Sequence, residues 1–398
     1  MIKIKDIKVR PNYLGISHKE LLKIGAIHTA KEIACQPELW LNAYELIEKN
    51  NKLLKSFLNE VYAHNDLQII LTGAGSSAFL GDVLEGVFQK YVGKKTSAIA
   101  TTELVTHPDY YLKCSGTLLL ISFARSGNSP ESVKAVELSD MFCKNIYHLI
   151  ITCNPDGELV KNISKKNSFV LYMPPDANDK SLAMTGSFTT MLLSGLLLAR
   201  IKELGELKTQ VLSLCEYGRK IITQYIQDLR IVSELNFTRA IFLGSGILRG
   251  VARESHLKLQ ELTDGNVVCN YDSFLGFRHG PKAVINGDTL IVYLFSNNGY
   301  VLNYEKDLVR AVNEGRKALC SIGIIENNID DIDFDLRIQL SNNSTKIDEV
   351  FLSIVSVLPA QILGFFKSLN LGLKPDTPSE SGMITRVVQG VKIYPYEK

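Results

Sequence analysis

Short apolar runs alternate with longer amphipathic segments along most of this chain. Residues 67–73, 96–100, 117–122, 147–152 and 168–173 are nearly continuous in apolar side chains, as in strands buried on both faces. The segments between them have helical length and spacing. Within residues 79–91, one helical face would carry Phe79, Val83, Leu84, Val87, Phe88 and Tyr91. This alternation predicts a parallel sheet that is covered by helices on both sides.

The same pattern starts again in the second half of the chain. The stretch "IILTGAGSSAFLGDVLEG" is similar to "AIFLGSGILRGVARESHL", and Gly73 of the first matches Gly244 of the second, 171 positions later. Further strands are expected at 266–270, 289–295, 319–325 and 336–340. We therefore predict an α/β protein with two similar tandem domains, each a parallel sheet flanked by helices in a three-layer sandwich.

The predicted organisation has three parts. Residues 1–50 are expected to form an N-terminal helical segment, in which Ser17 and Glu20 have the spacing of a capping box. Residues 51–215 are assigned to the first domain, and residues 216–398 to the second domain with a C-terminal tail. The boundary is placed inside the helical stretch 200–235.

Composition argues against two classes of partner. The chain has 44 basic and 42 acidic residues, a formal net charge of +2, so it has no general attraction for nucleic acid or anionic lipid.

Residues 1–15 lack the apolar core of a signal peptide. The apolar runs 191–201 and 351–366 are too short to span a membrane, and the second contains Pro359 and Gln361. Both are predicted to be buried helices, the second a candidate for a subunit interface.

The cysteines indicate the compartment. There are seven of them, an odd number, and no CxxC pair. Several lie in apolar runs, where a reduced thiol acts as a small core side chain. We expect a cytoplasmic protein without disulfides. No His or Cys cluster has zinc spacing, so we expect no metal and no cofactor.

Two polar turns follow predicted strands directly. Residues 118–138, "LLLISFARSGNSPESVKAVEL", run from a strand through Arg125, Ser126, Gly127 and Ser129 into a helix, and "GAGSS" does the same at 73–77. The first N–H groups of a helix have no internal partners and attract anions. One such serine is more simply explained as a helix cap. Two serine turns in one domain favour a phosphate site.

Other nucleotide motifs do not match. In "GAGSSAFLG" the third glycine position of G-x-G-x-x-G is taken by Ala78, and only Glu103 offers an acidic residue near the second strand. The chain has no GKS or GKT for a P-loop. A dinucleotide site is therefore poorly supported.

Residues 254–285 hold further candidate side chains. Lys258 and Glu261 lie one turn apart near the end of a predicted helix, which Asp264 and Gly265 should stop. On helical spacing alone, a surface ion pair is the simpler explanation. His279 lies in the turn "FRHGP", a setting in which a functional role and a purely structural one are about equally common.

Together, these motifs resemble the sugar isomerase (SIS) superfamily. The pieces that carry the resemblance are two Gly-Ser turns, "RSGNS", "KLQE…HGP", "AIHTAKEIACQPELW", "AMTGSFTTMLL" and "PSESGMITRVVQGVKIYPY". The layout is similar to the isomerase half of glucosamine-6-phosphate synthase. It is more similar to the bacterial tagatose-6-phosphate ketose/aldose isomerase group of the galactosamine-6-phosphate deaminase type. The resemblance covers nearly the whole chain.

The resemblance implies roles for single residues. The 6-phosphate would be held by Ser77, Arg125, Ser126 and Ser129, with Ser76 beside the sugar. Glu261 would carry the proton between C1 and C2, with Lys258 next to the reacting carbons. His279 would open the sugar ring, and by resemblance it would come from the neighbouring subunit. The chain departs from the synthase at Ala124, which replaces a phosphate-binding serine, and at Arg386, which replaces a lid lysine.

The reaction implied is deamination of a hexosamine 6-phosphate. A desolvated carboxylate suits the proton transfer, because burial raises its pKa toward working pH. The first cysteine, Cys35, lies inside a predicted helix, so the chain lacks the N-terminal nucleophile of a fused glutaminase. We therefore expect galactosamine 6-phosphate to give tagatose 6-phosphate and ammonia, in a homodimer or higher homo-oligomer with shared sites. An amine-independent isomerase and a non-catalytic phosphosugar sensor stay as alternatives, and the galacto configuration follows from resemblance alone.

Overall fold

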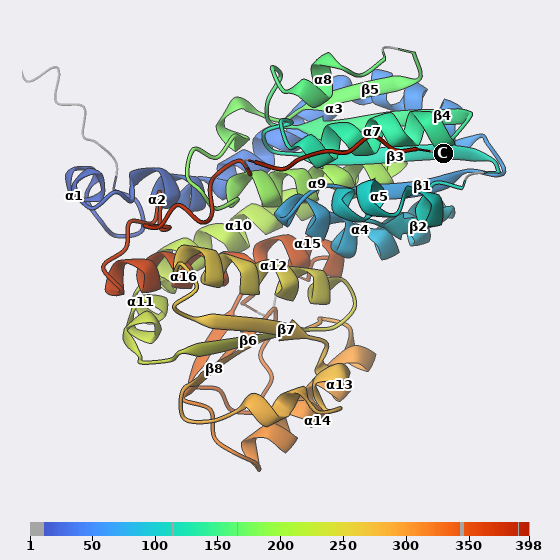
Figure 1. The fold of residues 1–398 in the computed structure, drawn as a ribbon. Coiled ribbons are helices and arrows are strands. Elements are labelled where there is room, and N and C mark those ends of the chain that lie inside the picture. The colour runs from blue at the N-terminus through green and yellow to red at the C-terminus, as the bar shows by residue number, and fades with distance from the viewer. Residues whose placement is uncertain (1–11, 114, 165, 343–345, 389, 398) are drawn as a thin grey trace, which may run out of the picture.

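Two parallel five-stranded sheets form the frame of the molecule (Figure 1). The structure is a computed structural model that describes residues 12–113, 115–164, 166–342, 346–388 and 390–397. The strands of the first sheet are β1 (Gln68–Thr72), β2 (Lys95–Ala98), β3 (Thr117–Ala124), β4 (Asn145–Thr152) and β5 (Ser168–Tyr172). Those of the second are β6 (Arg239–Gly244), β7 (Val268–Asp272), β8 (Thr289–Leu294), β9 (Cys320–Ile325) and β10 (Leu336–Gln339). The predicted α/β class is confirmed.

Both sheets have the same strand order. The first runs β2-β1-β3-β4-β5 and the second, read from its other edge, β7-β6-β8-β9-β10. This is the flavodoxin-like order, in which the direction of strand addition across the sheet reverses between the first and third strands. In register, Leu71 pairs with Ile121 across that reversal, and Leu243 pairs with Tyr293 in the second sheet. Ligands of such sheets bind at the carboxyl ends of these two strands.

Helices cover the first sheet on both faces. One face packs against α3 (Gln36–Tyr62), α4 (Ser76–Val92) and α9 (Gly186–Ala199), and the other against α5 (Thr101–Thr106), α6 (Pro108–Tyr111), α7 (Pro130–Phe142) and α8 (Glu158–Lys161). The period-2 alternation of a strand produces this arrangement. Thus Leu71 belongs to the core that contains Leu80 of α4, whereas Ile70 belongs to the core that contains Leu104 of α5.

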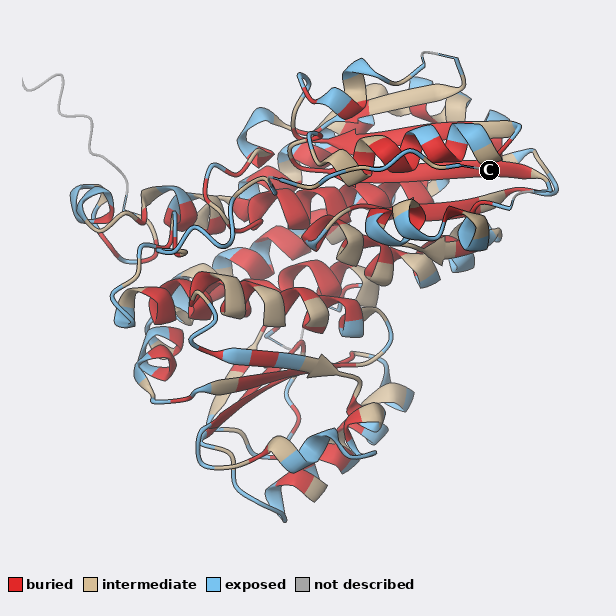
Figure 2. Ribbon diagram, in the orientation of Figure 1, coloured by how far each residue is buried: buried red, intermediate tan, exposed pale blue. Residues whose placement is uncertain are grey.

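A shared helical layer lies between the two sheets (Figures 1 and 2). Helix α12 (Ile247–Leu262) packs on β6 and β7 and, on its other side, against α4 of the first unit. The layer also contains α10 (Lys208–Gln224), α11 (Ile226–Glu234), α15 (Glu349–Val355) and α16 (Leu358–Asn370). The outer face of the second sheet carries α13 (Phe274–Phe277) and α14 (Gly299–Asn313). The shared layer holds the two units together through one continuous apolar core.

Short elements complete the fold. They are α1 (His18–Lys23), α2 (Ile27–Ala34) and the 3-10 helices η1 (Pro175–Ala177), η2 (Ile201–Glu203) and η3 (Pro281–Val284). The predicted cap is confirmed, since Glu20 N donates to Ser17 Oγ at 3.3 Å, although this helix already ends at Lys23. The proposed limits at 50/51 and 215/216 fall inside α3 and α10, and they stay a prediction.

Both long apolar runs are buried helices, as predicted. The first lies mostly in α9, all of whose residues are buried. The second spans α15 and α16, and Pro359 lies in the first turn of α16, where its missing N–H costs nothing. Residues 349–370 would be long and apolar enough to cross a membrane, but 94% of their most apolar window is buried inside the protein. Because α16 packs against α11 and α12 of its own chain, the segment offers no apolar face for a subunit contact, contrary to our expectation.

The cysteines are consistent with a reduced protein. Five of the described cysteines carry free thiols, with Cys35 half-buried and the other four buried: Cys153, Cys215, Cys269 and Cys320. The sixth, Cys143, is buried as well. Cys114 lies outside the described residues.

Candidate active site

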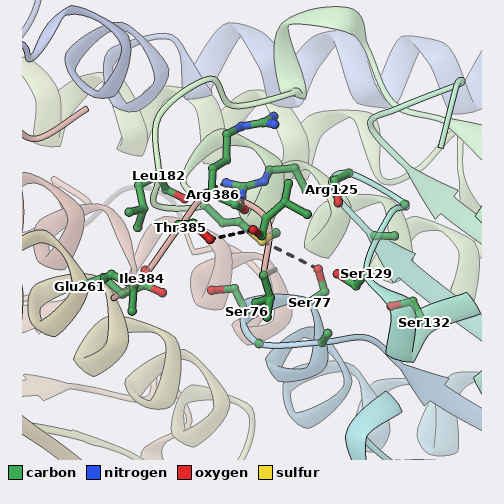
Figure 3. A pocket seen from close by; sticks show the side chains of 18 of the residues that line it. Ser76, Ser77, Arg125, Ser129, Ser132, Leu182, Glu261, Ile384, Thr385 and Arg386 are labelled. Carbon is green, nitrogen blue, oxygen red and sulfur yellow. Dashed lines mark hydrogen bonds between the residues drawn. The ribbon is translucent and has the colours of Figure 1, made fainter. Parts of the chain in front are cut away.

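A pocket of about 410 Å³ lies at the carboxyl ends of β1 and β3 (Figure 3). Four of its walls come from the turn at 74–77, the turn after β3, the loop at Leu182 and Met184, and the tail at 382–388. Lys258 and Glu261 of α12 line the side that belongs to the second unit. The pocket therefore lies at the reversal point of the first sheet, between the two α/β units.

The turn after β1 directs two serines into the pocket. Ser76 and Ser77 occupy the first turn of α4, where Ser77 N donates to Ala74 O at 3.1 Å. The backbone approaches itself closely here, because a Cβ on Gly73 would lie 2.5 Å from the carbonyl carbon of Ser77. Gly75 adopts φ 57°, a value that favours glycine. The glycines of the turn thus set the position of both hydroxyl groups.

The turn after β3 contributes a second group of hydroxyls. Ser129 occupies the N-cap position of α7, yet its side chain makes no capping hydrogen bond. The explanation of Ser129 as a mere helix cap is therefore wrong. Ser126 Oγ accepts only a 3.3 Å bond from Asn128 N, and Ser132, one turn into α7, also lines the pocket. Figure 3 shows Ser129 and Ser132 on the same side of the pocket as Ser77.

Lys258 is the centre of a buried charged cluster. Its side chain is 0% exposed, and its Nζ lies 2.8 Å from Glu261 Oε2 and 3.2 Å from Glu254 Oε1. The same ammonium group donates to Ser76 Oγ at 3.0 Å. The surface ion pair favoured by helical spacing is thus wrong, because α4 covers this face of α12.

The cluster carries an unusual distribution of charge. Burial raises the pKa of the Glu254 carboxyl to about 7, and Lys258 opposes this rise only in part. Burial alone would lower the pKa of Lys258, but Glu254 and Glu261 outweigh it, so the pKa is raised and the amine stays protonated. A fixed ammonium and a carboxylate beside a pocket are groups that can stabilise and move protons on a bound carbonyl compound.

The two arginines of the predicted site donate to three backbone carbonyls and one side-chain amide oxygen. Arg125 Nη1 donates to Leu182 O at 3.0 Å, and Arg125 Nη2 donates to Arg386 O. Arg386 Nε donates to Asp179 O at 2.8 Å, and its Nη2 to Asn178 Oδ1 at 2.7 Å. Burial lowers the pKa of the Arg125 guanidinium, although its charge persists at neutral pH.

The structure brings together all but one of the predicted site residues. Around the pocket lie Ser76, Ser77, Arg125, Ser126, Ser129, Lys258, Glu261 and Arg386. His279 is not among the residues that line it. It is exposed on the turn between α13 and η3, at the outer face of the second sheet. Within one chain, His279 and Glu261 therefore do not share a site.

Sequence reasoning missed three features of the pocket. Glu254 precedes Lys258 by four residues, a spacing that would have signalled a second carboxylate on the same face. Ser132 follows Ser129 by three, which would have placed it in the same helical turn. No local signal identifies Leu182 and Met184, which reach the pocket through the loop that precedes α9. Among the described residues, no group of three or more His, Cys, Asp or Glu side chains is arranged to hold a metal ion.

Comparison with known proteins agrees with this architecture. Residues 62–201 match the SIS domain family. The D-galactosamine-6-phosphate deaminase AgaS of Shewanella sp. (strain ANA-3) is 39% identical over 390 residues, 97% of this chain and 96% of that protein. The tagatose-6-phosphate ketose/aldose isomerase structure from Escherichia coli is 37% identical with a TM-score of 0.86, covering 93% of this chain and 97% of that one. A crystal structure from Clostridium novyi NT is 42% identical with a TM-score of 0.93, covering 97% and 100%. The chain belongs to the SIS domain family, in the group that contains the AgaS proteins.

Proposed function

We propose that this protein converts a hexosamine 6-phosphate, galactosamine 6-phosphate, into tagatose 6-phosphate and ammonia. The observation that carries the proposal is the buried cluster of Lys258, Glu254 and Glu261, which faces a pocket lined by serine hydroxyls at two helix N-termini. The relatives named D-galactosamine-6-phosphate deaminase match 93–97% of this chain, which supports the choice of substrate.

The serine groups suit a phosphate at one end of the substrate. Ser77, Ser126, Ser129 and Ser132 surround the region where the N-termini of α4 and α7 converge. Helix N-termini attract anions through their free N–H groups and the helix dipole. We infer that the 6-phosphate binds here, and that Ser132 supplies a hydroxyl in a turn where Ala124 offers none.

The charged cluster suits the proton transfer at the other end. In the open-chain aminoaldose, Glu261 removes the proton from C2 and returns it to C1, through an enolamine. The product of this step is a ketimine at C2. Lys258, held at 2.8 Å from Glu261 Oε2, stabilises the negative charge that develops on the C1 oxygen. Water then adds to C2 and the C–N bond breaks, so that one water is consumed and one ammonia released.

Ring opening needs a second acid or base, and His279 is our candidate. Since His279 is exposed and does not line the pocket of its own chain, we propose that it enters the site of a second subunit. A homo-oligomer with shared sites follows from this assignment. The free thiols of Cys35, Cys153, Cys215, Cys269 and Cys320 support a cytoplasmic location.

An amine-independent aldose–ketose isomerase is the alternative that one solved structure supports. The Escherichia coli neighbour is named an isomerase of tagatose 6-phosphate, a sugar without an amine. The same carboxylate and lysine would serve an aldose–ketose isomerisation through an enediol, with no loss of ammonia.

The deciding experiment supplies purified protein with galactosamine 6-phosphate, glucosamine 6-phosphate or tagatose 6-phosphate and follows ammonia and ketose separately. Ammonia and ketose released in equal amounts from galactosamine 6-phosphate support the proposal. An aldose formed from tagatose 6-phosphate without any ammonia release from the amino sugars supports the alternative. No turnover of any of the three sugars would favour a non-catalytic sensor.

A further inference from the structure

Arg125 and Arg386 hold two distant segments against each other at the pocket wall. Arg125 donates to the backbone carbonyl of Arg386 in the tail and to that of Leu182 in the loop before α9. Arg386 donates to Asp179 O and Asn178 Oδ1 of the same loop. Figure 3 shows the two side chains lying next to each other. All four acceptors are neutral oxygens, so no carboxylate is hydrogen-bonded to either guanidinium among the contacts of the described residues. We call this arrangement the arginine latch.

The loop before α9, which accepts the hydrogen bonds of Arg386, is itself held by two carboxylates. The carboxylate of Asp179 accepts the N–H groups of Thr185, Gly186 and Ser187, at 2.9, 3.1 and 2.9 Å, and so closes the N-terminus of α9. The carboxylate of Glu32 in α2 accepts Lys180 N at 2.5 Å. Asp179 is therefore occupied, and the latch uses its carbonyl rather than its charge. Such a loop forms a rigid support for the tail.

The tail is fastened at one earlier point. Asp376 Oδ1 accepts Thr29 N and Thr29 Oγ1, both at 2.8 Å, at the start of α2. The backbone of Asp376 also donates to Gly25 O, just before α2, at 3.0 Å and accepts from Leu182 N, in the loop before α9, at 3.1 Å. Between Asp376 and Arg386 the tail contains Gly382 at φ 70° and Met383, which is 88% exposed. Beyond the pocket, Tyr396 packs against Phe142 of α7, with ring centroids 5.2 Å apart. The latch thus attaches the pocket-lining stretch 382–388 between these two points.

We propose that Arg125 and Arg386 are positioning residues that dock the tail segment 382–388 over the pocket, and that Arg125 does not bind the substrate phosphate. The geometry gives Arg125 this role, because two of its guanidinium nitrogens already donate to carbonyls of the loop and the tail. Burial lowers the pKa of Arg125, the nearby Asp179 carboxylate raises it, and the like charge of Arg386 lowers it. The two guanidinium groups have no common acceptor, and each is held by oxygens of the other's segment or of the loop between them. This inference goes beyond the proposed function and rests on it only in taking the pocket as the substrate site.

The test measures tail docking without any substrate. Backbone hydrogen exchange of 382–388 is followed by mass spectrometry in the wild type, Arg125→Gln, Arg386→Gln and the double variant. Glutamine keeps part of the side chain and one donor group, so the fold is expected to survive. Each single variant should speed exchange of the segment by at least about tenfold, equivalent to about 1.4 kcal/mol. The double variant should exchange no faster than the worse single one, since both remove the same docked state.

A matched control comes from the second unit. Arg337 also donates to two backbone carbonyls, Ile329 O and Ile332 O, both at 2.8 Å. Arg337→Gln should speed exchange around 329–332 and leave 382–388 unchanged. Circular dichroism and melting temperature check that every variant folds, and Arg125→Lys replaces Arg125→Gln if the latter does not.

Two results would overturn the inference. Wild-type exchange of 382–388 in a folded Arg125 variant means that this arginine does not hold the tail. Exchange in the double variant equal to the product of the two single effects means that the arginines act separately. Because neither readout uses turnover, the latch can fail while the proposed reaction stands, and the reaction can fail while the latch stands.

Discussion

The Lys258 ammonium group donates to Ser76 Oγ at 3.0 Å, a contact between residues 182 positions apart. Ser76 begins α4 of the first unit and Lys258 lies in α12 of the second. The side chain that contacts Glu254 and Glu261 is thus held in place from across the domain interface. The groups proposed for proton transfer and for phosphate binding meet because α4 and α12 pack against each other.

Glu261→Gln should remove the proton carrier while preserving the shape of the site. A positioned base contributes about 10²–10⁴-fold, so we expect kcat to fall by that factor with little change in melting temperature. Steady-state release of ammonia measures kcat. If the variant keeps more than half of the wild-type activity, Glu261 is not the proton carrier and its role is structural.

Ser132→Ala tests whether the Ser132 hydroxyl, which lines the pocket, binds the substrate phosphate. Losing a hydrogen bond to a charged group costs roughly 1.5–3 kcal/mol, so KM for the phosphorylated sugar should rise by about tenfold or more. The matched control is Ser139→Ala in the same helix, since Ser139 Oγ donates to Ala135 O at 2.7 Å and does not line the pocket. If both variants change KM equally, Ser132 acts through the stability of α7 and not on the phosphate.

Stability should fall as pH rises, in part because of Glu254. Its pKa is raised from 4.5 to about 7 in the folded protein, so the folded state keeps a proton that the unfolded chain has released. This contribution is fully present below about pH 4.5 and is lost as pH rises through about 7, for a total of roughly 3 kcal/mol. In Glu254→Gln, denaturant unfolding between pH 5 and 8 should show a flatter pH dependence than in the wild type.

Glu305 provides the comparison for that experiment. Burial raises its pKa to about 7 as well, and its carboxylate accepts Ser296 N at 2.9 Å, away from the pocket. Glu305→Gln should flatten the pH dependence of stability to a similar degree while leaving kcat and KM at wild-type values. An unchanged slope in both variants would show that neither carboxyl holds its proton near neutral pH.

Gly73→Ala should disturb the first serine turn. The new Cβ would lie 2.5 Å from the backbone of Ser77, so α4 must shift, at a cost of typically about 1–3 kcal/mol. We expect a lower melting temperature and a higher KM. Gly86→Ala in the same helix meets nothing within 4 Å and should stabilise the protein by roughly 0.5–1 kcal/mol. Equal stability of the two variants would contradict the close approach at Gly73.

Subunit mixing tests the shared site. The inactive variants Glu261→Gln and His279→Asn are mixed in equal amounts and allowed to exchange subunits. In a dimer, half the molecules are mixed, and each mixed dimer has one site with both damaged residues and one with neither. Activity should recover to about a quarter of wild type. If verified exchange restores no activity, both residues act within one chain.

Much of the fold was determined by the sequence itself, because its signals are local. Strands at 67–73, 117–122 and 147–152 were predictable from nearly continuous apolar runs, which are typical of a sheet covered on both faces. The serine turns were identifiable for the same reason, since glycine and serine set the backbone and the donors within a few residues.

Only the tertiary structure decided what surrounds these side chains. Lys258 and Glu261 have the spacing of an exposed ion pair, and they are buried because α4, from the other unit, covers them. The latch joins Arg125 to a carbonyl 261 positions away. Burial and long-range pairing depend on how the elements pack, and local sequence periodicity carries no record of which distant element will lie against a given face.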